Sequence, residues 1–285
     1  MRNVFSSWSL VLLLMLSSAN VFGAINCSVS SAGINTAYTG ALSINQTTLD
    51  ITCTRLSGDP ATSAYSVSAD NGINAVGQVN RASLGGNYLS YQEFQDSICG
   101  TNWQPGSDIA GSINFGSALA VSVTVDYWAC LPAGQVYAVG SYNDTVLMTL
   151  TYNDGIGDVT TTGGHQVTII TSPSCSISTA PGVIAFSYTA LQNSATSTST
   201  TFGTTCSIDT SYSISVDTAD GVISGLQYSL RLNTADTGGS NPLGSSGTGV
   251  EQNFYINGTM PASQAGSCTS ANCQDSVVHT LLITY

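Results

Sequence analysis

The sequence predicts an all-β protein made of two tandem β-sandwiches, the second of which lacks its last strand. Three observations predict this class. Short runs of alternating apolar and polar residues are separated by Gly, Asn and Asp, which is typical of half-buried strands joined by tight turns. One set of motifs occurs twice in the same order. A final strand-like run follows the first set, and the second set has no counterpart of it.

The first 23 residues predict a signal peptide. Arg2 precedes an apolar stretch from Trp8 to Leu16, which is too short to span a bilayer. Small residues follow up to a cleavage site before Ala24, and an uncleaved membrane anchor is the alternative. The mature chain is therefore expected to be secreted.

The composition of the mature chain argues against nucleic acid and anionic lipid as partners. Three arginines, Arg55, Arg81 and Arg231, stand against 16 acidic residues without any lysine, which gives a net charge of −13. Such a chain repels partners that carry many phosphates. Charged residues make up 7% of the sequence and apolar residues 42%, which indicates a folded β-rich surface protein and not a disordered one.

The chain repeats one fold. "CSVS" at Cys27 recurs as "CSIS" at Cys175, and "YSVSADNG" at Tyr65 recurs as "YSISVDTADG" at Tyr212. Later, "LPAGQ" recurs as "MPASQ", and "DTVLMTLTY" recurs as "DSVVHTLLITY". The same elements in the same order predict a first domain at residues 24–171 and a second domain at residues 172–285. Each is expected to be a sandwich of about seven strands.

The two copies differ in their last strand. In the first copy a Gly-rich turn, "NDGIGDVTTTGG", leads into "HQVTIIT" (residues 165–171), an alternating run that completes the sandwich. The second copy has no such run after "SVVHTLLITY". We therefore expect an apolar face and unpaired backbone groups there. The expected strand-acceptor edge consists of Val277, His279, Leu281, Ile283 and Tyr285.

The cysteines predict disulfide bonds. All eight lie in the mature chain, and an even count is typical of an oxidising compartment. Chain order suggests two bridges within the copies, and these leave two further pairs: Cys27 with Cys53, Cys175 with Cys206, Cys99 with Cys130, and Cys268 with Cys273. Metal binding by "CTSANC" is the alternative for the last pair, but neither a histidine nor a second close cysteine pair supports it.

"PAGQVYAVGSYNDTVLMTLTY" (residues 132–152) resembles the closing signature of the spore coat protein U family. The resemblance is strong in the first copy and weaker in the second. That family supplies subunits of archaic chaperone–usher pili. It implies immunoglobulin-like sandwiches that a strand from the next subunit completes, after a periplasmic chaperone has lent one. It also implies an outer-membrane usher as partner and a route through the periplasm to a pilus on the cell surface.

Two-domain members of the family resemble tip subunits, with an adhesin domain followed by a pilin domain. Only three residues separate the expected cleavage site from Cys27, so we expect this chain to accept a strand and not to offer one. The expected function is a tip adhesin that mediates surface attachment or biofilm formation. The alternative is a structural spore-coat or minor pilus subunit that binds no receptor.

The sequence predicts neither an enzyme nor a cofactor or metal site. No nucleophile motif stands at a strand-to-helix turn, and acid pairs such as Asp154 with Asp158 are typical of turns, with a calcium site as the alternative. The two histidines, His165 and His279, lie within expected strands, where a core role is the simpler interpretation.

Two aromatic residues are candidates for surface contact, although most aromatics in a sandwich are core residues. Trp103 lies in a polar Gly/Pro loop between Cys99 and Cys130, where a disulfide would brace an exposed ring. Tyr88 lies in "SLGGNYLSY", which is expected to form a loop tip.

Overall fold

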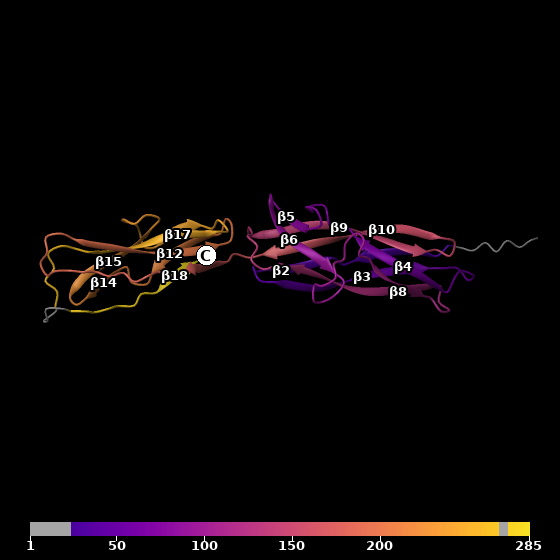
Figure 1. The fold of residues 1–285 in the computed structure, drawn as a ribbon, viewed down its shortest axis with the longest axis horizontal. Helices are drawn as coiled ribbons and strands as arrows, with labels where there is room; N and C mark the ends of the chain where they lie inside the picture. Colours follow the sequence, from indigo (N-terminus) through magenta and orange to yellow (C-terminus); the bar gives the residue numbers. More distant parts are fainter. Residues whose placement is uncertain (1–23, 268–272) are drawn as a thin grey trace, which may run out of the picture.

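The computed structural model describes residues 24–267 and 273–285, all of them in strands, turns and loops. The strands up to Thr171 bury one hydrophobic cluster, and those from Cys175 onward bury another. Figure 1 shows the two β-structures end to end, with the second to the left of the first. The described residues include no helix that would cross a membrane. The predicted signal peptide lies outside the described residues.

The first domain is a sandwich of two layers. Its strands are β1 (Asn26–Ser31), β2 (Ile34–Tyr38), β3 (Ser43–Thr54), β4 (Thr62–Ala69), β5 (Asn80–Leu84), β6 (Asn87–Phe94), β7 (Ile109–Asn114), β8 (Ala120–Leu131), β9 (Gly140–Asn153) and β10 (Asp158–Thr171). The strands form one continuous sheet that folds into the layers β1-β3-β8-β6-β5 and β7-β4-β9-β10-β2, joined where β5 pairs with β9. Alternate side chains point into the shared core, as the period of a strand requires.

Strand β10 completes this sandwich. It pairs antiparallel with β9 along its whole length and parallel with β2 from Val167 to Thr171. Its inward residues include His165, Val167 and Ile169, all of them buried. It therefore satisfies the backbone groups of two strands and covers the core between them.

The described residues of the second domain repeat this pairing without strands at the places of β2 and β10. Its strands are β11 (Cys175–Thr179), β12 (Thr196–Cys206), β13 (Ser211–Val216), β14 (Asp220–Ile223), β15 (Leu226–Asn233), β16 (Leu243–Ser246), β17 (Glu251–Met260) and β18 (Leu281–Thr284). One layer runs β11-β12-β17-β15-β14 and the other β16-β13-β18. These pairings match those of β1 and β3 to β9, so β18 is the counterpart of β9.

The two domains also share their strand register. Cys27 lies opposite Cys53 in one domain, and Cys175 lies opposite Cys206 in the other. In the second layer Val67 pairs with Leu150, and their counterparts Ile214 and Ile283 also pair. The repeat in the sequence is thus a repeat of contacts, residue by residue.

Three expectations about strands were wrong in detail. The described residues of the two domains form ten and eight strands, where about seven were expected for each, because β2 and the short β5 and β14 are separate strands. The last strand of the first domain begins at Asp158 and not at His165, since its threonines pair with β9. Residues 276–280 were expected in the last strand of the second domain, yet β18 begins at Leu281. Unlike β9, this strand has a partner on one side only.

The domains meet at a small joint. The backbone N–H of Ile208 donates to the carbonyl of Tyr137, and Ala138 forms a parallel bridge with Ile208. A Cβ placed on Gly249 would lie 2.3 Å from a side-chain carbon of Val136, so the backbone of the second domain touches the first there.

Candidate functional site

The candidate site is the unpaired side of β18 together with the segment that corresponds to β2. In the first domain β9 lies between β4 and β10. In the second domain β18 pairs with β13 and ends its sheet. Among the described residues of the second domain, no strand takes the place of β10. The backbone groups on the free side of β18 are therefore available to another strand.

The segment from Ile184 to Tyr188 corresponds to β2. The hydroxyl of Tyr188 donates to the carbonyl of Pro261 at 2.8 Å, as the hydroxyl of Tyr38 donates to that of Pro132 at 2.7 Å. Each hydroxyl also accepts a backbone N–H, from Gln264 in the second domain and from Gln135 in the first. The same two tyrosine hydrogen bonds thus hold the segment in place in both domains. In the second domain the segment forms no strand, because it lacks a neighbouring strand to pair with.

The side chains of this region are half exposed, unlike their counterparts. Ile177 of β11 is 40% exposed, whereas its counterpart Val29 is 6% exposed. Partly buried side chains also pack against the second core from both sides of the empty position: Ile184, Phe186, Tyr188, Leu281 and Ile283. We call these five residues, with the free side of β18, the open edge.

Three hydrogen-bonded side chains, those of Tyr228, His279 and Asp217, lie beside the open edge. Nε2 of His279 is 2.9 Å from the hydroxyl of Tyr228, and Nδ1 of His279 is 3.0 Å from Oδ1 of Asp217. The hydrogen bond from His279 lowers the pKa of Asp217, and burial raises the pKa of Tyr228. Both imidazole nitrogens are therefore engaged within the second domain.

The five predicted acceptor residues differ in burial and in whether they belong to β18. Leu281 and Ile283 lie in β18 and pack against the core, as the open edge requires. His279 precedes the strand and is half buried. Val277 and Tyr285 are exposed. Since β18 is short, only its central residues hold the geometry of a strand.

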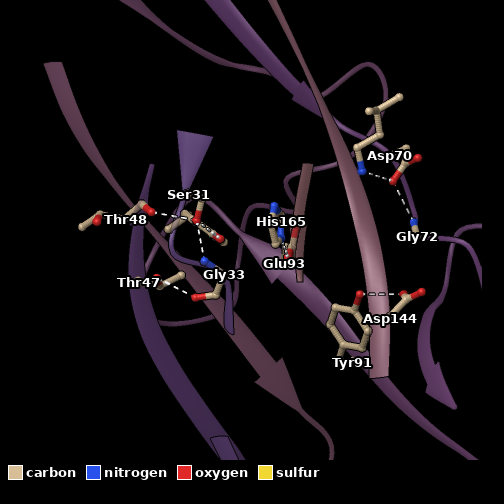
Figure 2. Close-up of polar contacts among 12 residues, drawn as sticks. Ser31, Gly33, Thr47, Thr48, Asp70, Gly72, Tyr91, Glu93, Asp144 and His165 are labelled. Atoms are coloured by element: carbon tan, nitrogen blue, oxygen red, sulfur yellow. Dashed lines mark hydrogen bonds and ion pairs between the residues drawn. The ribbon is translucent and has the colours of Figure 1, made fainter. Parts of the chain in front are cut away.

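The first domain shows how the corresponding site looks when a strand fills it. His165 of β10 and Glu93 of β6 are fully buried, with Nε2 and Oε1 2.7 Å apart (Figure 2). Nearby, the hydroxyl of Tyr91 donates to Asp144 at 2.8 Å, and burial raises the pKa of Tyr91 strongly. These polar pairs were not recognised in the sequence, because their members lie far apart along the chain.

The structure corrects the interpretation of Trp103. Its side chain is completely buried and its indole N–H donates to the carbonyl of Val67 at 2.8 Å. The ring packs edge-on against Tyr127 and stacks on His165. The polar residues around Trp103 suggested an exposed loop, but the loop folds back over the core. Trp103 therefore offers no surface for contact.

Tyr88 is 44% exposed, and the guanidinium of Arg81 lies 4.1 Å from the centre of its ring. It belongs to the β5–β6 hairpin, on the side of the first domain that faces the second domain (Figure 1).

Three disulfide bonds join the pairs that chain order suggested: Cys27–Cys53, Cys99–Cys130 and Cys175–Cys206. The first and third link directly opposed strands, β1 with β3 and β11 with β12. Cys273 is disulfide-bonded, and its expected partner Cys268 lies outside the described residues. Among the residues that the structure describes, no cluster of His, Cys, Asp or Glu is arranged to hold a metal ion.

Exposed apolar residues gather in three turns, and the sequence analysis did not name these residues as candidates for surface contact. Leu56, Leu119 and Ile156 are 64%, 52% and 76% exposed. The turns adjoin one another: the N–H of Arg55 donates to Leu119, and a Cβ on Gly155 would lie 3.0 Å from Pro60. They connect ends of β3, β4, β7, β8, β9 and β10, away from the second domain. Single apolar residues within "RLSGDP", "GSAL" and "DGIGD" were the available signal.

The chain thus combines a sandwich closed by its own last strand with a second sandwich that is open at the same place. Residues 14–149 match the family model of the Spore Coat Protein U domain. The matched domain is that of a structural protein, and the chain is not an enzyme. No curated protein matches the chain in sequence.

Solved structures of pilus subunits are similar to the chain at low identity. The tip subunit CsuE of archaic Csu pili of Acinetobacter baumannii, in a pre-assembly complex with the chaperone CsuC, is 14% identical, with 91% of this chain and 99% of that chain covered and a TM-score of 0.46. The CupB6 tip adhesin of Pseudomonas aeruginosa is 10% identical, with 92% of this chain and 94% of that chain covered and a TM-score of 0.41.

Proposed function

We propose that the protein is a subunit of a chaperone–usher pilus that accepts a donor strand at the open edge of its second domain. The observation that carries this proposal is the difference between the two domains at the place of β10. The second domain keeps the counterpart of β9, the segment that corresponds to β2 and the tyrosine hydrogen bonds that hold this segment, but no strand among its described residues takes the place of β10. The resemblance to pilus subunits of the spore coat protein U family supports it.

The energetics favour a strand supplied by another protein. A donor strand would cover three or four apolar side chains, each contributing about 1.5–3 kcal/mol when fully buried. It would also pair about half a dozen backbone groups at about 0.5–1.5 kcal/mol each. Even after the cost of ordering the strand, the gain is comparable with the total stability of a typical domain, about 5–15 kcal/mol. Main-chain pairing of this kind is a known mode of recognition.

The proposed partners follow from this need. A periplasmic chaperone would lend a strand to the open edge before assembly, and an outer-membrane usher would exchange it for the N-terminal strand of the next pilin. The protein would then reach the cell surface as part of a pilus.

The first domain suits a position at the tip. Its own strand β10 closes it, so it needs no donor. The exposed Leu56, Leu119 and Ile156 lie at its free end, where an adhesin would meet a surface. We therefore propose that the first domain is the adhesin and that the protein mediates attachment or biofilm formation. A structural coat or minor pilus subunit would share the open edge but would not need exposed apolar turns at this end.

A donor-strand extension tests the open edge. A short Gly/Asn linker and an alternating apolar strand are added after Tyr285 of the mature chain. We expect a soluble monomer with a markedly higher unfolding temperature of the second domain, while the unextended chain aggregates or is degraded. The control strand carries charged residues at the inward positions and should gain nothing. A stable unextended monomer that the extension leaves unchanged would contradict the proposal.

A second experiment tests the position in the pilus. Immunogold labelling of intact pili should mark one end of each fibre. Label spread evenly along the shaft would support the minor-subunit alternative.

A further inference from the structure

The open and closed sites differ at one buried position. In the first domain, His165 of β10 points inward onto Glu93, and both side chains are fully buried. The remaining polar side-chain atoms, Oε2 of Glu93 and Nδ1 of His165, are buried without a hydrogen-bond partner. Each residue therefore depends on the other, because a buried polar group without its partner is costly.

The counterpart of Glu93 in the second domain is Leu230. Glu93 pairs with Ala129 of β8, and Leu230 pairs with Gly258 of β17, which occupies the place of Ala129 in the repeat. The adjacent hydrogen bonds fix the same alignment: the side chain of Gln135 bonds both backbone groups of Ser90, and that of Gln264 bonds both backbone groups of Gln227. The carboxylate that receives His165 is thus replaced by a buried leucine.

The surroundings of Leu230 are also apolar. Tyr127, whose ring lies 5.6 Å from that of His165, corresponds to the buried Ile256. A Cβ on Gly258 would lie 2.6 Å from the ring of Phe186, so this ring covers the backbone where Ala129 stands in the first domain. No carboxylate among the described residues of the second domain corresponds to Glu93.

The neighbouring strand presents a histidine instead. His165 lies opposite Val146 of β9, and the repeat places His279 where Val146 stands. Both nitrogens of His279 are already hydrogen-bonded, to Tyr228 and Asp217. An incoming histidine would therefore meet a second imidazole across the strands and find no free acceptor on it.

We propose that the open edge selects its donor strand by the residue at the position of His165, taking an apolar side chain and disfavouring histidine. This inference rests on the proposed function and names the chemistry of the partner strand. The two domains thus differ in the strand that they accept. Strand β10 fits the first domain because His165 meets Glu93, whereas β10 of a second copy would place its histidine against Leu230 and is a poor donor for the second domain. The protein is thereby kept from pairing with itself.

Two extended chains test this selection. Each carries, after Tyr285, a Gly/Asn linker and a copy of residues 159–171, and the second has His165→Val in the added copy only. We expect the valine strand to raise the unfolding temperature of the second domain by about 4–8 °C more than the histidine strand, because about 1 kcal/mol shifts a domain of this size by that amount. Added as free peptides to the unextended chain, the valine strand should bind at about fivefold lower concentration than the histidine strand, which is the same difference of about 1 kcal/mol.

The matched variant restores the carboxylate. In chains with Leu230→Glu, the order of the two strands should reverse. The corresponding experiment in the first domain needs no added strand. There, Glu93→Leu alone should strongly lower the unfolding temperature of the domain, and Glu93→Leu together with His165→Val should lower it less.

The outcomes separate this inference from the proposed function. If both strands stabilise the second domain equally, selection at this position is wrong and strand acceptance stands. If neither strand stabilises it, the open edge accepts no strand and both proposals fall. The comparison of valine with histidine in the unaltered second domain decides the matter even if Leu230→Glu does not fold.

Discussion

The imidazole of His279 hydrogen-bonds the carboxylate of Asp217, with Nδ1 and Oδ1 3.0 Å apart. The contact joins the turn after β13 to the residues that precede β18. In the first domain the corresponding residues are Val146 and Asp70, which do not form such a pair because valine has no donor. The second domain therefore has its own polar anchor beside the open edge.

This pair makes the second domain sensitive to acid. The hydrogen bond from His279 lowers the pKa of Asp217 below its ordinary value of 3.8. A carboxylate with a depressed pKa in the folded state contributes stability above its unfolded pKa, and this stability is lost as the pH falls through the folded pKa. We expect the unfolding temperature of the second domain to fall below about pH 4, and Asp217→Asn to make this fall smaller. Thermal unfolding of the strand-extended chain between pH 6 and pH 2 measures it.

A control for the acid effect lies in the first domain. Backbone N–H groups of the loop after Asp96 lower the pKa of Asp96 as well, with that of Gly100 first. Asp96→Asn should change the acid dependence of the first domain and leave that of the second unchanged. Identical profiles for Asp217→Asn and the unaltered chain would contradict the role given to His279.

The disulfide within the second domain should be a major part of its stability. Cys175 and Cys206 are 31 positions apart in the sequence, and closing a loop of this size contributes about 2–4 kcal/mol. We expect Cys175→Ala with Cys206→Ala to lower the free energy of unfolding of the extended chain by this amount, as measured with denaturant. Digestion without reduction should show four bridges and no free thiol, and a bridge between the domains would contradict the pairing.

Trp103 should matter for stability and not for attachment. Its ring is completely buried, and the indole N–H is bonded to Val67. Trp103→Ala should therefore destabilise the first domain by about 3–5 kcal/mol. Tyr88→Ala, at a half-exposed ring, should cost much less. Denaturant unfolding of both variants measures the difference, and equal losses would show that the ring of Trp103 is not part of the core in solution.

The free end of the first domain should mediate attachment. Leu56→Ser, Leu119→Ser and Ile156→Ser together should reduce adhesion of piliated cells by at least about tenfold, because each side chain loses its apolar contact with the surface. Unfolding of the first domain should hardly change, since these side chains are exposed. Ile73→Ser is the matched control, because Ile73 is equally exposed, at 75%, but lies in a different loop. Unchanged adhesion of the triple variant would favour the structural subunit without receptor binding.

Much of the fold could be predicted from the sequence because its signals are local. Alternating residues predicted the all-β class, and the repeated "PAGQ" and "PASQ" predicted two copies, whose glutamines make the same backbone bonds. Strand ends were less accurate. The threonines before His165 form half of β10, since pairing with β9 overrides their polar character.

The order and the period of motifs along the chain predicted two related sandwiches, because both signals are local. Which side chains face each other depends on the tertiary structure. Trp103 became a core residue, His165 met Glu93, and Leu230 took the place of that carboxylate. Such contacts depend on strand register and on burial between layers, and residues 72 positions apart carry no local sign that they will share one buried hydrogen bond.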